Sequence, residues 1–289
     1  MEDNREISAL FRLIDDPDHD VYDTVSEKII SFGKEIIPHL EQLWEKIENE
    51  ETQERIEMLI HRVHFRDLTT DFIKWKADDA SLINGALLVA RYNYPEMQPI
   101  TVLQEIEKIR RNTWLELNSY LTPIEQINVV NSIFFNYYKQ KGVEISYDNP
   151  DPFLINKAIE TKKGNALGNG ITYLILCELL DIPVKAINIP RQFLLAYLDN
   201  SYEAFNPKGH ASEQVKFYID ALNGQMYSQK DIENYFKKLA VHPASSYFRP
   251  KKNKKVIQFL LEELAKCFDN ERNRYKMEEL LLLAAMLDE

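Results

Sequence analysis

The chain has 289 residues, 45% of them hydrophobic and 28% charged, so it can bury a core without metals or disulfides and most of it is not disordered. Forty-six acidic residues against 35 basic ones give a net charge of −11, which argues against nucleic acid and anionic membranes as partners. Two distant cysteines, no signal-peptide pattern and no apolar run long enough to cross a bilayer predict a cytoplasmic protein with no membrane contact.

The first part of the chain reads as a series of short helices. Apolar residues recur at helical spacing over 7–14, 21–30 and 37–47, and the acidic D-D-P-D run between the first two can cap the second. This order, followed by Gly33 and an I-P-H-L segment, resembles a HEAT-type repeat, with a partial second copy over 52–65. We therefore predict a HEAT-like helical region over residues 1–68.

Further helices are predicted downstream, before the pattern changes to that of a sheet. Helical spacing continues through 69–141. It then predicts a short helix over 155–161 and a buried helix over 171–180. After Pro183 the apolar residues alternate, which predicts short antiparallel strands. The expected strands are 184–190, 193–198, 202–205 and 215–222.

The chain then returns to helical spacing at 229–239 and 255–287. The basic KKNKK run between these two segments is interpreted as a solvated linker, because the chain as a whole is acidic. We predict three regions in all. They are the HEAT-like region 1–68, a core region 69–240 (helices 69–141, then 142–240) and a C-terminal helical hairpin 241–289.

Glycine is scarce, with eight in the chain, yet three of the eight fall within seven residues at Gly164, Gly168 and Gly170. They open the segment KKGNALGNGITYLILCELLDIPVKAINIPRQFLLAY, which FYIDALNG follows. Together with LINGALLVARYNYPEMQP and YDNPDPFLINKAIETKKG, this order resembles the transglutaminase-like superfamily, in the branch related to bacterial Sir-type invasion-gene regulators. The resemblance covers roughly 80–240. It implies an α+β, mostly helical protein, whose papain-like core has a small antiparallel sheet and is followed by C-terminal helices.

The resemblance also implies where a catalytic triad would lie. An active member has a cysteine at the start of the buried helix, a histidine on a neighbouring strand and an aspartate that orients the histidine. Here the first position is Ala166 and the second is Gln192, whose amide cannot act as a general base. Only Asp220 retains its type, so the resemblance predicts a degenerate triad with no catalytic residue.

Two alternatives would restore a function to this region. A cysteine hydrolase or acyl transferase could use relocated groups, such as Cys177, about 16 Å further along the helix, or the loop residue His210. A small-molecule binder could use the free N–H groups of the turn at 164–170. The competing interpretation is that the glycines only allow close packing. The candidate binding residues are Asn165, Gly168, Asn169, Gln192, Asp220 and Asn223.

No cofactor is predicted. His61 and His64 could both touch a metal, but Asp67 is the one further ligand at suitable spacing, so the pair is interpreted as a helix-surface pair and no metal site is predicted. The leading hypothesis is a non-catalytic scaffold or regulator that binds another protein or a peptide. The sequence does not identify that partner.

Overall fold

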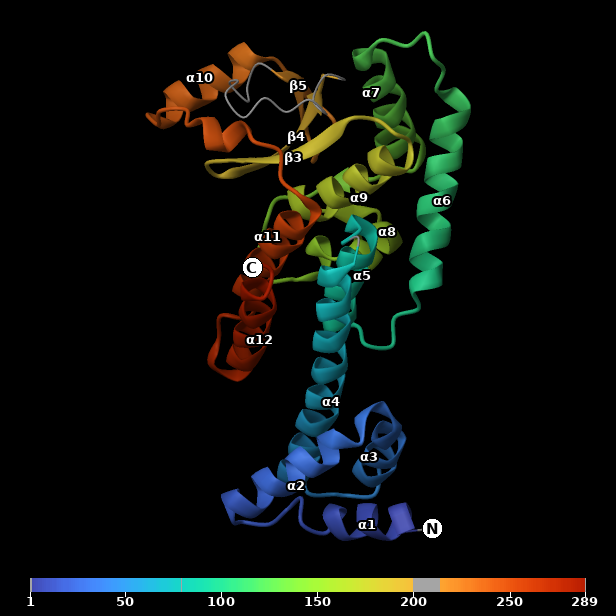
Figure 1. The fold of residues 1–289 in the computed structure, drawn as a ribbon, viewed down its shortest axis with the longest axis vertical. Coiled ribbons are helices and arrows are strands. Elements are labelled where there is room, and N and C mark those ends of the chain that lie inside the picture. The colour runs from blue at the N-terminus through green and yellow to red at the C-terminus, as the bar shows by residue number, and fades with distance from the viewer. Residues whose placement is uncertain (1, 79, 200–213, 289) are drawn as a thin grey trace. The chain divides into compact units, whose positions relative to one another are not determined.

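A computed structural model describes residues 2–78, 80–199 and 214–288 (Figure 1). The chain divides into two compact units, Met1–Lys74 and Trp75–Glu289. The expected strand 202–205 and the candidate residue His210 lie outside the described residues. The two units are described separately below.

The first unit consists of helices with one shared core. Asp18 caps the second helix by accepting from the Asp20 N–H, as the acidic run predicted, and Gly33 ends that helix with a φ of +69°. Ile29, Leu40 and Ile56 are fully buried in the core. The elements are α1 (Glu2–Phe11), α2 (His19–Ser31), a 3-10 turn (Gly33–Ile36), α3 (Ile37–Trp44) and the first part of α4 (Glu50–Ala77).

Helix α4 joins two segments that the sequence analysis treated separately, the partial repeat over 52–65 and the start of the helical region expected from residue 69. It runs for 28 residues from Glu50 to Ala77, because no proline or glycine interrupts it. The helical character of this region is confirmed, and its HEAT-like nature stays a prediction.

In the second unit, proline residues and a capping box mark where helices begin. Pro99 and Pro123 occupy first-turn positions, and Thr122 and Glu125 form a capping box. The helix expected from 123 to 140 instead changes after Asn131 into a π-helical segment, Ser132–Tyr137. The helices are α5 (Leu82–Asn93), α6 (Pro99–Glu116), α7 (Pro123–Asn131), α8 (Ile155–Thr161) and α9 (Ala166–Leu179).

A four-stranded antiparallel sheet follows α9, in the order β3-β4-β5-β6, and it confirms the predicted α+β class. Leu194 of β4 pairs with Asp220 of β5. A two-residue parallel pair, β1 (Lys141–Gly142) with β2 (Lys163–Gly164), was not predicted. The four strands are β3 (Val184–Ile189), β4 (Gln192–Leu198), β5 (Val215–Asp220) and β6 (Met226–Tyr227).

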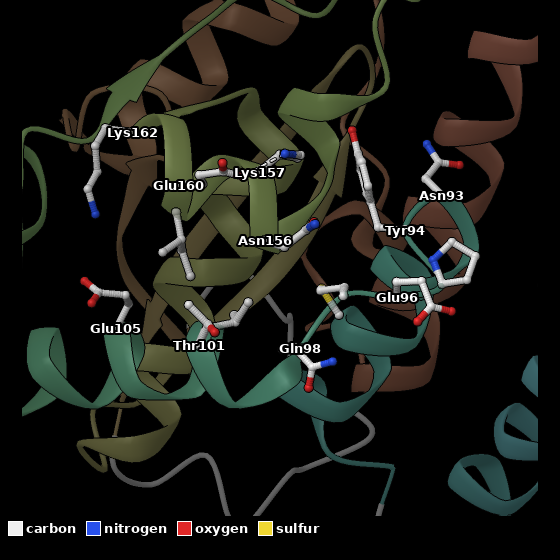
Figure 2. A pocket seen from close by; sticks show the side chains of 14 residues that line it. Asn93, Tyr94, Glu96, Gln98, Thr101, Glu105, Asn156, Lys157, Glu160 and Lys162 are labelled. Atoms are coloured by element: carbon white, nitrogen blue, oxygen red, sulfur yellow. Dashed lines mark hydrogen bonds and ion pairs between the residues drawn. The ribbon is translucent and has the colours of Figure 1, made fainter.

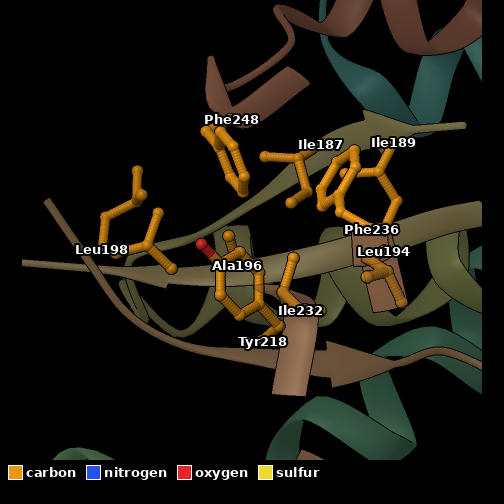
Figure 3. Close-up of a cluster of buried hydrophobic side chains, with 10 residues drawn as sticks. Ile187, Ile189, Leu194, Ala196, Leu198, Tyr218, Ile232, Phe236 and Phe248 are labelled. Carbon is orange, nitrogen blue, oxygen red and sulfur yellow. The ribbon is translucent and has the colours of Figure 1, made fainter. Parts of the chain in front are cut away.

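Each face of this sheet is covered by a different helix. On one face, α10 (Gln229–Leu239) packs Ile232 and Phe236 against Leu194 and Tyr218 (Figure 3). The other face packs against α9, whose Gly170 lies against the Phe193 ring. Because side chains alternate along a strand, neighbouring β4 residues serve different faces.

Two C-terminal helices, α11 (Asn253–Ala265) and α12 (Arg274–Ala285), lie side by side (Figure 1). Helix α11 packs on α5. The Tyr92 hydroxyl of α5 donates to a Glu279 carboxylate oxygen of α12 at 2.7 Å. These contacts attach the C-terminal helices to the helices that precede the sheet.

We predict that Phe236→Ala lowers the free energy of unfolding by about 3–5 kcal/mol, because the ring is 1% exposed and its loss leaves a cavity between α10 and the sheet. Urea denaturation followed by circular dichroism measures the change. Lys237→Ala, at the next and exposed position, is the control and is expected to change stability by less than about 0.5 kcal/mol. Equal effects of the two substitutions would contradict this account of the core.

Candidate functional site

Two buried asparagines hold the first turn of α9. The Asn165 side chain accepts from the N–H groups of Leu167 and Gly168 at 3.0 and 2.9 Å. Asn169 accepts from the Gln140 amide at 2.9 Å and donates to the Lys141 carbonyl at 3.2 Å. Both side chains are almost fully buried, so these two candidate binding residues maintain the turn.

The glycines of this turn are sites of close approach. A Cβ on Gly168 would lie 2.2 Å from the Pro152 carbonyl oxygen, and one on Gly164 would lie 2.1 Å from the Asn169 Oδ1. A Cβ on Gly170 would lie 2.7 Å from the Phe193 ring. This geometry favours the interpretation that the glycines allow close packing, since two of the turn's N–H groups already bond to Asn165.

Gln192 and Asp220 lie on the face of the sheet that α10 covers. Gln192 precedes Phe193, whose ring faces α9, so the Gln192 side chain points to the other face. Asp220 pairs directly with Leu194, which belongs to the core under α10. The Asp220 carboxylate accepts from the Leu222 N–H at 2.8 Å. The structure thus brings Gln192 and Asp220 to one face of the sheet, while helix α9, which begins at Ala166, packs on the other face.

The surroundings of Asp220 agree with this placement. Burial, and next the Asp220 carboxylate, raise the pKa of Tyr227, which packs against the α10-facing core. Gln192 lines a cavity of about 400 Å³ together with Tyr227 and with Tyr235 of α10. The remaining candidate, Asn223, is exposed and accepts from the Gln225 N–H at 2.8 Å within the β5–β6 turn.

The start of α9 and Gln192 nevertheless meet in one cavity, of about 630 Å³, which we call the hairpin cavity. Leu167 lines it from α9, while Arg191 and Gln192 line it from the β3–β4 hairpin. Arg191 has a φ of +65° and forms no ion pair within the described part of the chain. The other lining residues are Ile145, Tyr147, Asn188, Ile189, Pro190, Phe193, Tyr247, Phe259, Glu263 and Lys266.

Polar groups at the rim of the hairpin cavity are ordered by contacts with one another. The Tyr147 hydroxyl donates to Glu263 at 2.7 Å, and Lys266 forms an ion pair with the same carboxylate at 2.6 Å. The Phe193 and Phe259 rings stack at 6.1 Å. The cavity therefore offers aromatic surface beside a guanidinium that has no ion-pair partner among the described residues.

Sequence reasoning missed most of these residues. Arg191 carried one local signal, a position between two strands at the spacing of a tight hairpin. Tyr147 comes from a loop and Phe259 from α11, more than 35 residues away from the hairpin on either side. Only the tertiary fold brings such distant residues together.

Neither cysteine has the character of a nucleophile. Cys177 is fully buried in α9, and burial raises the pKa of its thiol far above the ordinary value. Burial, followed by the charges of Asp148 and Glu263, raises the pKa of Cys267 to about 11. Both thiols therefore stay protonated at neutral pH.

The part of the chain that the structure describes holds neither a candidate metal site nor a candidate membrane span. No group of three or more His, Cys, Asp or Glu side chains among them could hold a metal ion. In the same ranges, no helix is both long and apolar enough to cross a membrane.

Comparisons with known proteins identify a family and two relatives of this chain. The family model of the transglutaminase-like superfamily matches residues 100–262, more than half of the chain. Protein SirB1 of Salmonella typhimurium is 21% identical over 199 residues, which are 68% of this chain and 69% of SirB1. The UPF0162 protein BU173 of Buchnera aphidicola is 21% identical over 157 residues, so the match spans about half of each protein, 54%. No solved structure gives a significant match.

We predict that Gly168→Ala lowers the free energy of unfolding by about 1–3 kcal/mol, because the new methyl group would overlap the Pro152 backbone carbonyl. Thermal and urea denaturation measure the loss. Ala166→Ser, two residues earlier on the same turn and partly exposed, is the matched control, with an expected change below about 0.5 kcal/mol. If Gly168→Ala is as stable as the control, close packing does not explain the glycine.

Proposed function

Because this chain belongs to the transglutaminase-like superfamily, we propose that it uses the fold as a non-catalytic scaffold or regulator that binds a peptide segment of another protein. One observation carries the proposal. By the resemblance, the positions that would hold the nucleophile and the base are Ala166 and Gln192, and neither side chain can supply the group that its position needs. Acyl transfer through a thiol needs both groups in contact.

The state of the thiols supports the absence of catalysis. A catalytic cysteine has a lowered pKa, which charge or a helix N-terminus provides. Cys177 of α9 is buried in apolar surroundings, and Cys267 is partly buried beside two acidic side chains. Both environments raise the pKa of the thiol instead of lowering it. This disfavours the alternative of a hydrolase or transferase with relocated groups.

The hairpin cavity is where we propose that the peptide binds. Its aromatic side chains offer apolar surface, and Arg191 can donate to carbonyl or carboxylate oxygens of a bound segment. The net charge of −11 continues to argue against nucleic acid. We further propose a cytoplasmic location, since the unpaired Cys177 and Cys267 suit a reducing environment.

The first test of the proposal is thiol alkylation of the folded full chain with iodoacetamide, followed by mass spectrometry. We expect Cys267 to react at a rate that rises with pH towards an apparent pKa of about 11, because only the thiolate attacks. Cys177 is expected to react only after denaturation. Cys267→Ala isolates Cys177 as the control. Rapid labelling of Cys177 at neutral pH, with turnover of a peptide or amine substrate, would falsify the non-catalytic proposal.

The second test selects binders from a displayed random-peptide library on the full chain. Arg191→Asn removes the guanidinium while tolerating the left-handed backbone, and Phe259→Ala removes one aromatic wall. We expect each substitution to weaken the selected peptides by about tenfold, measured by calorimetry. Lys237→Ala, which lies outside the hairpin cavity, is the control and should leave the affinity unchanged. Selected peptides whose affinity is unchanged by both cavity substitutions would show that the binding surface lies elsewhere.

A further inference from the structure

A second cavity, of about 760 Å³, lies between the α5–α6 connection, α6 and α8 (Figure 2). We call it the α6–α8 cavity. Its walls come from two segments that the sequence analysis singled out, residues 93–98 in YNYPEMQP and residues 156–162 in the segment that ends in ETKKG. The proposed function uses neither segment.

The middle of the α6–α8 cavity is apolar. Met97, Val102 and Ile159 line it, and the Tyr94 ring closes one end. Tyr94 is held in place, since its hydroxyl donates to Asp151 at 2.6 Å and the Lys157 ammonium lies 4.8 Å from the centre of its ring. The volume and the lining are those of a small-molecule site.

Five charged side chains line the cavity, and most of their charge is already balanced. Lys157 forms an ion pair with Glu160 at 2.7 Å, and Glu105 pairs with Lys108 of the same helix. Glu96 also has an interaction partner. Lys162 is the exception, because it forms no ion pair within the described ranges. The Tyr138 ring lies 5.7 Å from its ammonium, and Glu105 lies at the same end of the cavity (Figure 2).

Lys162 lies at the end of the cavity opposite Tyr94 (Figure 2). The Lys162 side chain is partly buried. The residue follows the last residue of α8 and has a left-handed backbone conformation, with a φ of +58°. A partly desolvated ammonium beside an apolar wall interacts strongly with an anion, since water screens it less than on an open surface. The cavity thus has an apolar lining and, at one end, the Lys162 ammonium, which has no ion-pair partner among the described residues.

We propose that the α6–α8 cavity binds a small carboxylate with an apolar tail. The tail lies against Met97, Val102 and Ile159, and the carboxylate accepts from the Lys162 ammonium. A cationic ligand fits less well, because the glutamates that would attract it already have partners. This site is separate from the hairpin cavity and does not depend on the proposed function.

The test compares three probes with the same tail on the full chain at about pH 7.5, where a carboxylic acid is ionised. They are octanoate, 1-octanol and octylammonium, and isothermal titration calorimetry gives each affinity. We expect octanoate to bind about tenfold more tightly than 1-octanol, and octylammonium to bind most weakly. Lys162→Gln should remove the advantage of octanoate while leaving 1-octanol unchanged, and Lys162→Arg should retain it.

A pair of tryptophan variants locates the binding. Thr101→Trp places a large ring in the α6–α8 cavity and is expected to abolish octanoate binding, whereas Gln104→Trp, on the same helix but outside the cavity, should leave it intact. Thermal denaturation confirms that all variants fold. Equal affinity for the three probes, preference for octylammonium, octanoate binding that survives Thr101→Trp, or no octanoate binding at all would each overturn the proposal.

Discussion

The close approach of the α9 turn to the chain around it is the constraint on which the second unit depends. Gly168 passes the Pro152 carbonyl with no room for a Cβ, and Gly170 does the same at the Phe193 ring. Asn165 and Asn169 supply the hydrogen bonds that such a buried turn needs. Since the turn touches both the preceding loop and the sheet, it sets where α9 lies against the strands.

This turn also organises the two cavities. The Val143 N–H donates to the Gly164 carbonyl at 3.0 Å, which joins the turn to the segment after the π-helix. Lys162, just before the turn, lines the α6–α8 cavity, and Leu167, just after it, lines the hairpin cavity. One short stretch of backbone thus contributes to both cavities.

Much of the fold was predictable because local signals agree with tertiary packing in this chain. Helical spacing placed α10 at its observed bounds, and the alternation after Pro183 placed β3, β4 and β5 within two residues of theirs. The predictions failed where packing decides. Examples are the π-helix after Asn131 and the two-residue pair of β1 with β2, which has too few residues to show a pattern.

The sequence by itself determined the chemistry of two side chains, because an alanine at 166 has no nucleophilic atom and a glutamine at 192 has no basic one in any conformation. Only the tertiary structure decided where the remaining polar groups point. The pairing of Leu194 with Asp220 directs the Asp220 side chain towards α10, and a shift of one residue would have reversed it. The cavities likewise depend on segments far apart in the chain, whose meeting no local pattern records.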